Sequence, residues 1–62
     1  MNLREIRHSK GLTMKQVATM ANVSEAAISL YERGQRVPSL AVAHRIAQAL
    51  GVTIDELIGK AG

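Results

Sequence analysis

The short connection around Asn22 limits the possible folds of this chain more than any other feature of the sequence. Residues 14–21 are predicted to form a helix, because Thr13 can act as its N-cap and Gln16 can complete a capping box. A new helix starts almost at once, with Ser24 as its N-cap. So short a connection cannot fold the second helix back antiparallel without a wide loop. We therefore expect the two axes to cross steeply, with Asn22 in the left-handed backbone region that asparagine tolerates well.

Three further helices are predicted on either side of this pair. Leu3 and Ile6 recur at helical spacing in the first of them, which Gly11 can end. Pro38 blocks the backward extension of a longer helix, for which Ser39 is the N-cap. The apolar stripe predicted to face the core from this longer helix consists of Leu40, Ala43, Ile46, Ala47 and Leu50. The predicted helices cover residues 2–10, 14–21, 25–33, 40–50 and 54–58.

The composition favours packed helices in one small all-α domain, residues 1–62. Hydrophobic residues make up 47% of the sequence, and nearly all of them are aliphatic, with Tyr31 as the sole aromatic residue. The chain has no cysteine, so neither a disulfide nor a thiolate metal site can supplement the core. Charged residues interrupt every apolar stretch, and Met1 leads into charged residues rather than into an apolar signal segment. We expect a soluble, cytoplasmic protein.

Few residues of the chain suggest catalysis. His8 and His44 fall on different predicted helices, with no cysteine or carboxylate at ligand spacing, so we predict no metal site. No histidine lies close in sequence to Ser24 or Ser29 to act as a base, and a domain of 62 residues has little room for a substrate cleft. We therefore expect no enzymatic activity, no cofactor and no small-molecule ligand.

The charge balance is weakly basic. Eight lysine and arginine residues against five acidic residues give a net charge of +3, which favours an anionic partner such as nucleic acid. Many small domains have a similar charge without binding nucleic acid, so this observation only supports the pattern that follows.

The helix that follows Ser24 has one face that the core does not need. If Ile28 and Tyr31 point inward, the helical repeat of about 3.6 residues turns the opposite side chains outward. Those outward residues are Glu25, Ala26, Ser29, and Leu30 or Arg33. A helix held steeply across its partner can protrude far enough to enter the major groove of DNA, which admits one helix.

Motifs along nearly the whole chain resemble those of the XRE family, the lambda Cro and phage-repressor type of helix-turn-helix domain. They are Gly11-Leu12-Thr13, Gln16-Val17-Ala18, Val23-Ser24, Ile28-Ser29, Tyr31-Glu32-Arg33-Gly34 and Pro38-Ser39. The resemblance implies a compact five-helix, lambda-repressor-like fold with the helix-turn-helix at residues 14–33. It also implies a transcriptional regulator, most commonly a repressor, that binds double-stranded DNA at a palindromic operator as a homodimer.

The resemblance places four residues of the third helix against base edges: Glu25, Ala26, Ser29 and Leu30. Family members commonly have an amide at the first of these sites, whereas Glu25 can only accept hydrogen bonds. Its carboxylate could accept from a cytosine amino group, and Ala26 or Leu30 could contact a thymine methyl group.

The resemblance also implies contacts with the sugar-phosphate backbone. Met14 occupies a position where the family typically has a glutamine that contacts the backbone, so that side-chain contact is missing here. Lys15 could supply charge beside it, and the N-terminus of the helix offers free amides to a phosphate. The positions implied to contact phosphate are Arg7, Met14, Lys15, Ser24, Arg33, Gln35 and Arg36.

Two further expectations concern packing between helices and between subunits. Arg7 and Glu32 match positions that form an ion pair in relatives, and the alternative is two solvated charges worth under about 1 kcal/mol. Candidate dimer residues lie near the end of the chain, although some of them must also close the core. They are Val52, Ile54, Leu57 and Ile58.

Other functions remain compatible with the sequence. The weakly polar face of the third helix could bind a protein instead of a base, an interpretation that Leu30 and Met14 favour. The chain could also be an antitoxin or the DNA-binding part of a longer regulator.

Overall fold

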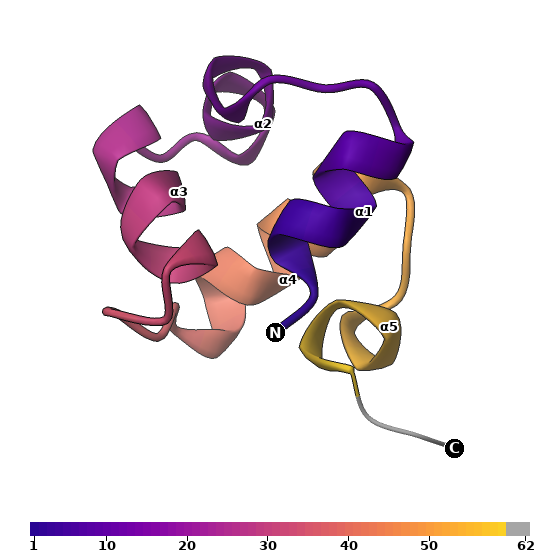
Figure 1. The fold of residues 1–62 in the computed structure, drawn as a ribbon. Helices are drawn as coiled ribbons and strands as arrows, with labels where there is room; N and C mark the ends of the chain where they lie inside the picture. The colour runs from indigo at the N-terminus through magenta and orange to yellow at the C-terminus, as the bar shows by residue number, and fades with distance from the viewer. Residues whose placement is uncertain (60–62) are drawn as a thin grey trace.

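The computed structural model describes residues 1–59, which form five helices joined by short connections (Figure 1). The predicted all-α, five-helix fold is confirmed for these residues, and each predicted helix is present within two residues of its expected ends. The helices are α1 (Leu3–Ser9), α2 (Met14–Ala21), α3 (Glu25–Glu32), α4 (Leu40–Leu50) and α5 (Ile54–Ile58).

Side-chain caps begin four of the helices. Thr13 Oγ1 accepts from the amide of Gln16 at 3.0 Å, and Gln16 Oε1 accepts from the amide of Thr13 at 2.8 Å, which closes the predicted capping box of α2. Thr53 and Glu56 form the second capping box at α5. Ser24 and Ser39 cap α3 and α4 through single bonds to main-chain amides. The four helix starts are therefore specified by local sequence.

Asn22 makes the corner between α2 and α3. It has φ 57° and ψ 47°, the left-handed conformation expected for it, and no other non-glycine residue among those described has a positive φ. Two residues later Ser24 is extended and starts α3. In Figure 1 the viewer looks along α2 while α3 is seen from the side, so the two axes cross steeply as predicted.

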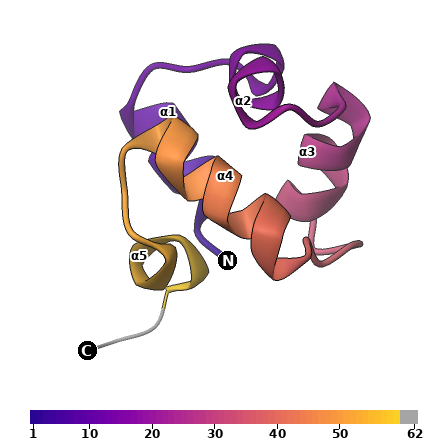
Figure 2. The same cartoon turned by 180° about the vertical axis from the view of Figure 1, so that it is seen from behind.

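The core lies where α4 meets the other helices. Figure 2 shows α4 running diagonally across the molecule, from beside α1 to the end of α3. Ile46 of α4 is fully buried, as are Val17 of α2 and Ile28 of α3. Ala18 and Ala21 of α2 are also buried, and their small side chains allow α3 and α4 to pack closely against α2. This packing leaves one side of α3 uncovered.

Two sequence-based expectations need correction. Leu40 was predicted to face the core, but its side chain is 77% exposed because it is the first residue of α4, where no other described segment covers that face of the helix. Leu57 was a candidate for the dimer surface, but it is fully buried because it is the apolar residue with which α5 closes the core. Val52 and Ile54 are half-buried against the core, and Ile58 is 46% exposed.

Hydrogen bonds connect the two ends of the described chain. The amide of Asn2 donates to the carbonyl oxygen of Leu57 at 2.7 Å, and the Asn2 side chain donates to the carbonyl oxygen of Glu56. This contact attaches α5 to the start of α1. No helix within residues 1–59 is long and apolar enough to cross a membrane.

Candidate nucleic-acid interface

The first turn of α3 is exposed on the side that faces away from the core. Glu25 and Ala26 are exposed, and Ser29 and Leu30 are half-buried one turn later on the same side. On the opposite side Ile28 is fully buried and Tyr31 is 8% exposed. The structure thus brings the four predicted base-reading residues together on one surface, which we call the reading face.

Ser24 and the first turn of α3 combine an anion-binding end with a negative side chain. Ser24 Oγ accepts from the amide of Ala27 at 3.0 Å, which leaves its own hydroxyl hydrogen available to a phosphate. The N-terminus of the helix favours anions, so the carboxylate of Glu25 is stabilised there in the free protein. Against DNA the same carboxylate would repel phosphates, and it needs a hydrogen-bond donor on a base to offset that repulsion.

Exposed cations lie on both sides of α3 in the sequence. Lys15 is exposed in the first turn of α2, and Arg33 and Arg36 are exposed after the end of α3, with Gln35 between them. Arg33 Nε donates weakly to the carbonyl oxygen of Ser29 at 3.4 Å. All of these side chains are exposed, and their contact with a phosphate strand stays a prediction.

Met14 contributes to this surface through its main chain only. Its side chain is partly buried against the core and has no group that could bind a phosphate. The capping box engages the amide of Gln16, so the amides of Met14 and Lys15 remain at the end of α2, where a helix presents its unpaired donors.

Arg7 and Glu32 form a bidentate ion pair that connects α1 to the last residue of α3. Arg7 Nε lies 2.6 Å from Glu32 Oε2, and Nη2 donates to Oε1 at 3.1 Å. Nη1 donates to the carbonyl oxygen of Leu12 at 2.9 Å. The hydrogen bonds to Glu32 raise the pKa of the Arg7 guanidinium, and burial opposes this only in part. The guanidinium is largely engaged, and a phosphate contact by Arg7 stays a prediction.

Sequence reasoning missed Arg45. This residue of α4 donates from Nε to the carbonyl oxygen of Ala21 at 2.9 Å, at the end of α2 and one residue before the corner at Asn22. The partners lie 24 positions apart in the chain, and no capping or periodicity rule relates them. Only the packing of α4 against α2 reveals the contact.

No group of three potential metal ligands occurs among residues 1–59. The steeply crossed α2 and α3, with the reading face exposed and cations beside it, instead define a helix-turn-helix domain.

Comparison with known proteins agrees with this class. The sequence profile of the Helix-turn-helix family HTH_3 matches residues 3–57. The crystal structure of the restriction-modification controller protein C.AhdI from Aeromonas hydrophila superposes with a TM-score of 0.86 at 36% sequence identity, covering 89% of this chain and 83% of that one. The chain belongs to the XRE-type helix-turn-helix family of DNA-binding transcriptional regulators.

Curated relatives include proteins of different lengths. The uncharacterized HTH-type transcriptional regulator y4dJ of Sinorhizobium fredii is 39% identical over 92% of this chain and 74% of its own length. The HTH-type transcriptional repressor RghR of Bacillus subtilis is 43% identical over 97% of this chain but only 45% of its own length. The chain therefore spans less than half of that repressor.

Proposed function

We propose that this domain binds double-stranded DNA sequence-specifically and represses transcription, with α3 inserted into the major groove. The exposed N-terminal half of α3 is the observation on which this proposal rests. The proposed compartment is the cytoplasm, and the proposed domain is the whole chain, residues 1–62.

Base recognition is assigned to the reading face. The carboxylate of Glu25 accepts a hydrogen bond from the amino group of a cytosine, and the apolar surface of Ala26 or Leu30 contacts a thymine methyl group. The hydroxyl of Ser29 can donate or accept at a neighbouring base edge. Each good contact of this kind is worth about 1 to 3 kcal/mol of discrimination.

The phosphate strands are held from both ends of the reading face. Lys15 and the free amides of α2 bind on one side, and Arg33, Gln35 and Arg36 bind on the other, together with the hydroxyl of Ser24. Binding of cations to phosphates releases counterions, so affinity must fall steeply as salt rises.

A homodimer on a palindromic operator completes the proposal. One protomer inserts a single short helix and contacts too few base pairs to select a site within a genome. Two copies related by a two-fold axis would read two half-sites, which doubles the number of base contacts.

Selection of bound duplexes from a random library tests the proposal. The expected result is an inverted repeat whose half-sites are about 10 base pairs apart, centre to centre, on one face of the helix. The affinity for the selected duplex is then measured at about 50 and 200 mM salt, and a large loss between them is expected. Failure to enrich any sequence would refute sequence-specific binding.

The rival function is protein binding by the same face, either as an interaction module or as an antitoxin. The half-buried, apolar side chain of Leu30 on the reading face favours it. The salt titration separates the two functions, because an apolar protein contact does not weaken steeply with salt.

A further inference from the structure

The corner between α2 and α3 has few restraints of its own. Only Asn22 and Val23 separate the last residue of α2 from Ser24, the N-cap of α3. The amide of Asn22 donates to the carbonyl oxygen of Thr19 at 3.3 Å. The amide of Val23 donates to the carbonyl oxygen of Ala18 at 3.0 Å. Both bonds return to α2 and neither reaches α3, so the direction in which α3 leaves the corner depends on packing and on contacts from other helices.

Arg45 of α4 supplies such a contact. Its Nε donates to the carbonyl oxygen of Ala21, the last residue of α2, at 2.9 Å, and the bond is partly buried. The guanidinium thus places a positive charge at the negative end of the α2 dipole. Within residues 1–59, this is the only side-chain hydrogen bond that connects α4 to α2 or α3. Arg45 therefore holds the residue immediately before the corner against α4.

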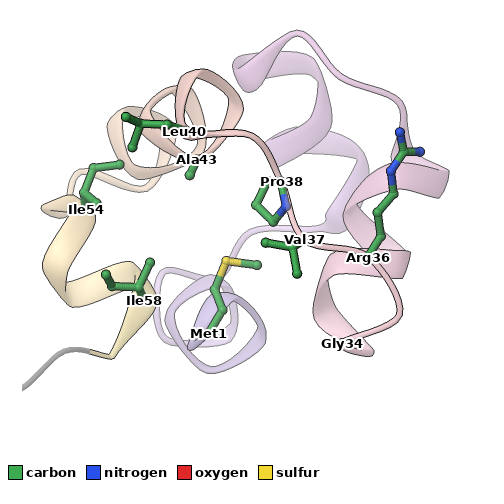
Figure 3. Close-up of a pocket in the computed structure, with 9 residues that line it drawn as sticks. All are labelled: Met1, Gly34, Arg36, Val37, Pro38, Leu40, Ala43, Ile54 and Ile58. Carbon is green, nitrogen blue, oxygen red and sulfur yellow. The ribbon is translucent and has the colours of Figure 1, made fainter.

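The packing around this bond keeps its two partners in place. Ile46 and Ala47, which follow Arg45 in α4, are buried, and Ala21 is fully buried on α2. Close packing of this kind resists relative movement of the two helices. By contrast, the first turn of α4 borders an open groove of about 480 Å³, shown in Figure 3, where Leu40 is 77% exposed. The restraint on the corner therefore comes from the middle of α4.

We infer that Arg45 is a positioning residue for base recognition, and this inference rests on the proposed function. Arg45 contacts neither a base nor a phosphate itself. It acts through Ala21 on the corner, and the corner sets the angle between α2 and α3. The N-terminus of α2 holds a phosphate strand while the reading face of α3 contacts bases, so both contacts form together only when that angle is fixed.

A looser corner affects the two kinds of DNA contact differently. Hydrogen bonds to base edges require a narrow range of distances and angles, and they carry the sequence information. Contacts between cations and phosphates tolerate small displacements and are the same on every sequence. Loss of the bond from Arg45 to Ala21 therefore lowers affinity for the operator and leaves binding to unrelated DNA unchanged. A residue that binds phosphate would instead affect all duplexes alike.

Three variants test the inference on DNA. Arg45→Met removes the donor and keeps the length of the side chain. Arg4→Met is the matched control, because it removes one positive charge from an exposed position on α1. Arg45→Lys retains a charged donor for the carbonyl oxygen of Ala21. The affinities for the selected duplex and for a scrambled duplex are measured at a temperature at which circular dichroism shows all variants to be fully folded.

Arg45→Met is expected to bind the selected duplex about fivefold more weakly than Arg4→Met does, the effect of losing one modest hydrogen bond, and to bind the scrambled duplex equally well. Arg45→Lys is expected to recover most of the loss. A purely structural role would change neither affinity while the protein is folded. Equal affinities of Arg45→Met and Arg4→Met for the selected duplex, an equal loss on both duplexes, or an absence of rescue by lysine overturns the inference.

Amide hydrogen exchange tests the restraint without DNA. The amide of Val23 closes the end of α2, and the amide of Val52 makes the same bond at the end of α4, to the carbonyl oxygen of Ala47 at 3.0 Å. In Arg45→Met, exchange at Val23 is expected to quicken about fivefold more than exchange at Val52. An equal change at both amides overturns the inference. If the library yields no duplex, the proposed function fails, and exchange still decides whether Arg45 restrains the corner.

Discussion

Arg45 of α4 donates from Nε to the carbonyl oxygen of Ala21, the last residue of α2, at 2.9 Å. The contact places a cation at the negative end of a helix and satisfies a carbonyl that has no partner within the helix. Because Asn22 follows directly, this bond restrains the corner that sets the direction of α3.

Arg45→Met is expected to lower the free energy of unfolding by about 1 to 2 kcal/mol, because a part-buried, charge-assisted hydrogen bond is lost. Urea denaturation measures the change. Arg4→Met, at an exposed position of α1, is the matched control and should have almost no effect on stability. Equal destabilisation by the two substitutions would contradict a specific role for Arg45.

Glu32→Ala is expected to destabilise the domain by about 3 kcal/mol, since it leaves the Arg7 guanidinium buried without its carboxylate. Replacing both residues by leucine should cost less than the sum of the two single leucine substitutions, because the double variant leaves no charge unpaired. Thermal or urea unfolding of all variants measures the coupling. Strictly additive costs would indicate that the pair contributes no interaction energy.

Glu25→Gln is expected to change the selected operator at one position in each half-site, from cytosine toward adenine. Glutamine can donate as well as accept, which matches the adenine edge, whereas a carboxylate only accepts. Total affinity should rise, because the substitution removes repulsion between the carboxylate and the phosphates. Repeating the library selection with the variant measures both effects, and an unchanged consensus would remove Glu25 from the reading face.

Ala26→Arg is expected to change which duplexes are recovered, because it adds a long donor in the middle of the reading face. A guanidinium there favours guanine, with which it can form two hydrogen bonds. Repeating the selection from the random duplex library with the Ala26→Arg protein tests this expectation. Recovery of the wild-type consensus would show that Ala26 does not lie against a base.

Arg36→Ala is expected to weaken binding to all duplexes alike and to reduce the slope of log K against log salt by about one, because one phosphate contact is lost. Affinities for the selected and a scrambled duplex at several salt concentrations provide the measurement. A change confined to one sequence would instead assign Arg36 to base recognition.

Local signals in the sequence were sufficient to predict the five helices and the corner at Asn22. Thr13 and Ser24 act on amides three residues away, so their role depends only on neighbouring residues. The outward face of α3 followed from the helical repeat, once Ile28 and Tyr31 were taken as core residues.

Features that depend on contacts between distant segments were not predictable in the same way. Leu40 fits the periodicity of α4, but its burial depends on whether α5 and the loop before α4 cover it. In the structure they leave its side chain exposed. The bond from Arg45 to Ala21 likewise exists only because α4 crosses the end of α2. The Arg7–Glu32 pair is the exception among long-range contacts, because a resemblance, rather than periodicity, suggested it.

Tyr31, buried in α3, is the sole aromatic residue of the sequence. The protein therefore has one intrinsic fluorophore, and it belongs to the helix that we assign to DNA recognition. Its emission reports the release of that helix from the core without an engineered label, so the detachment of α3 and the loss of overall helicity, followed by circular dichroism, can be compared directly.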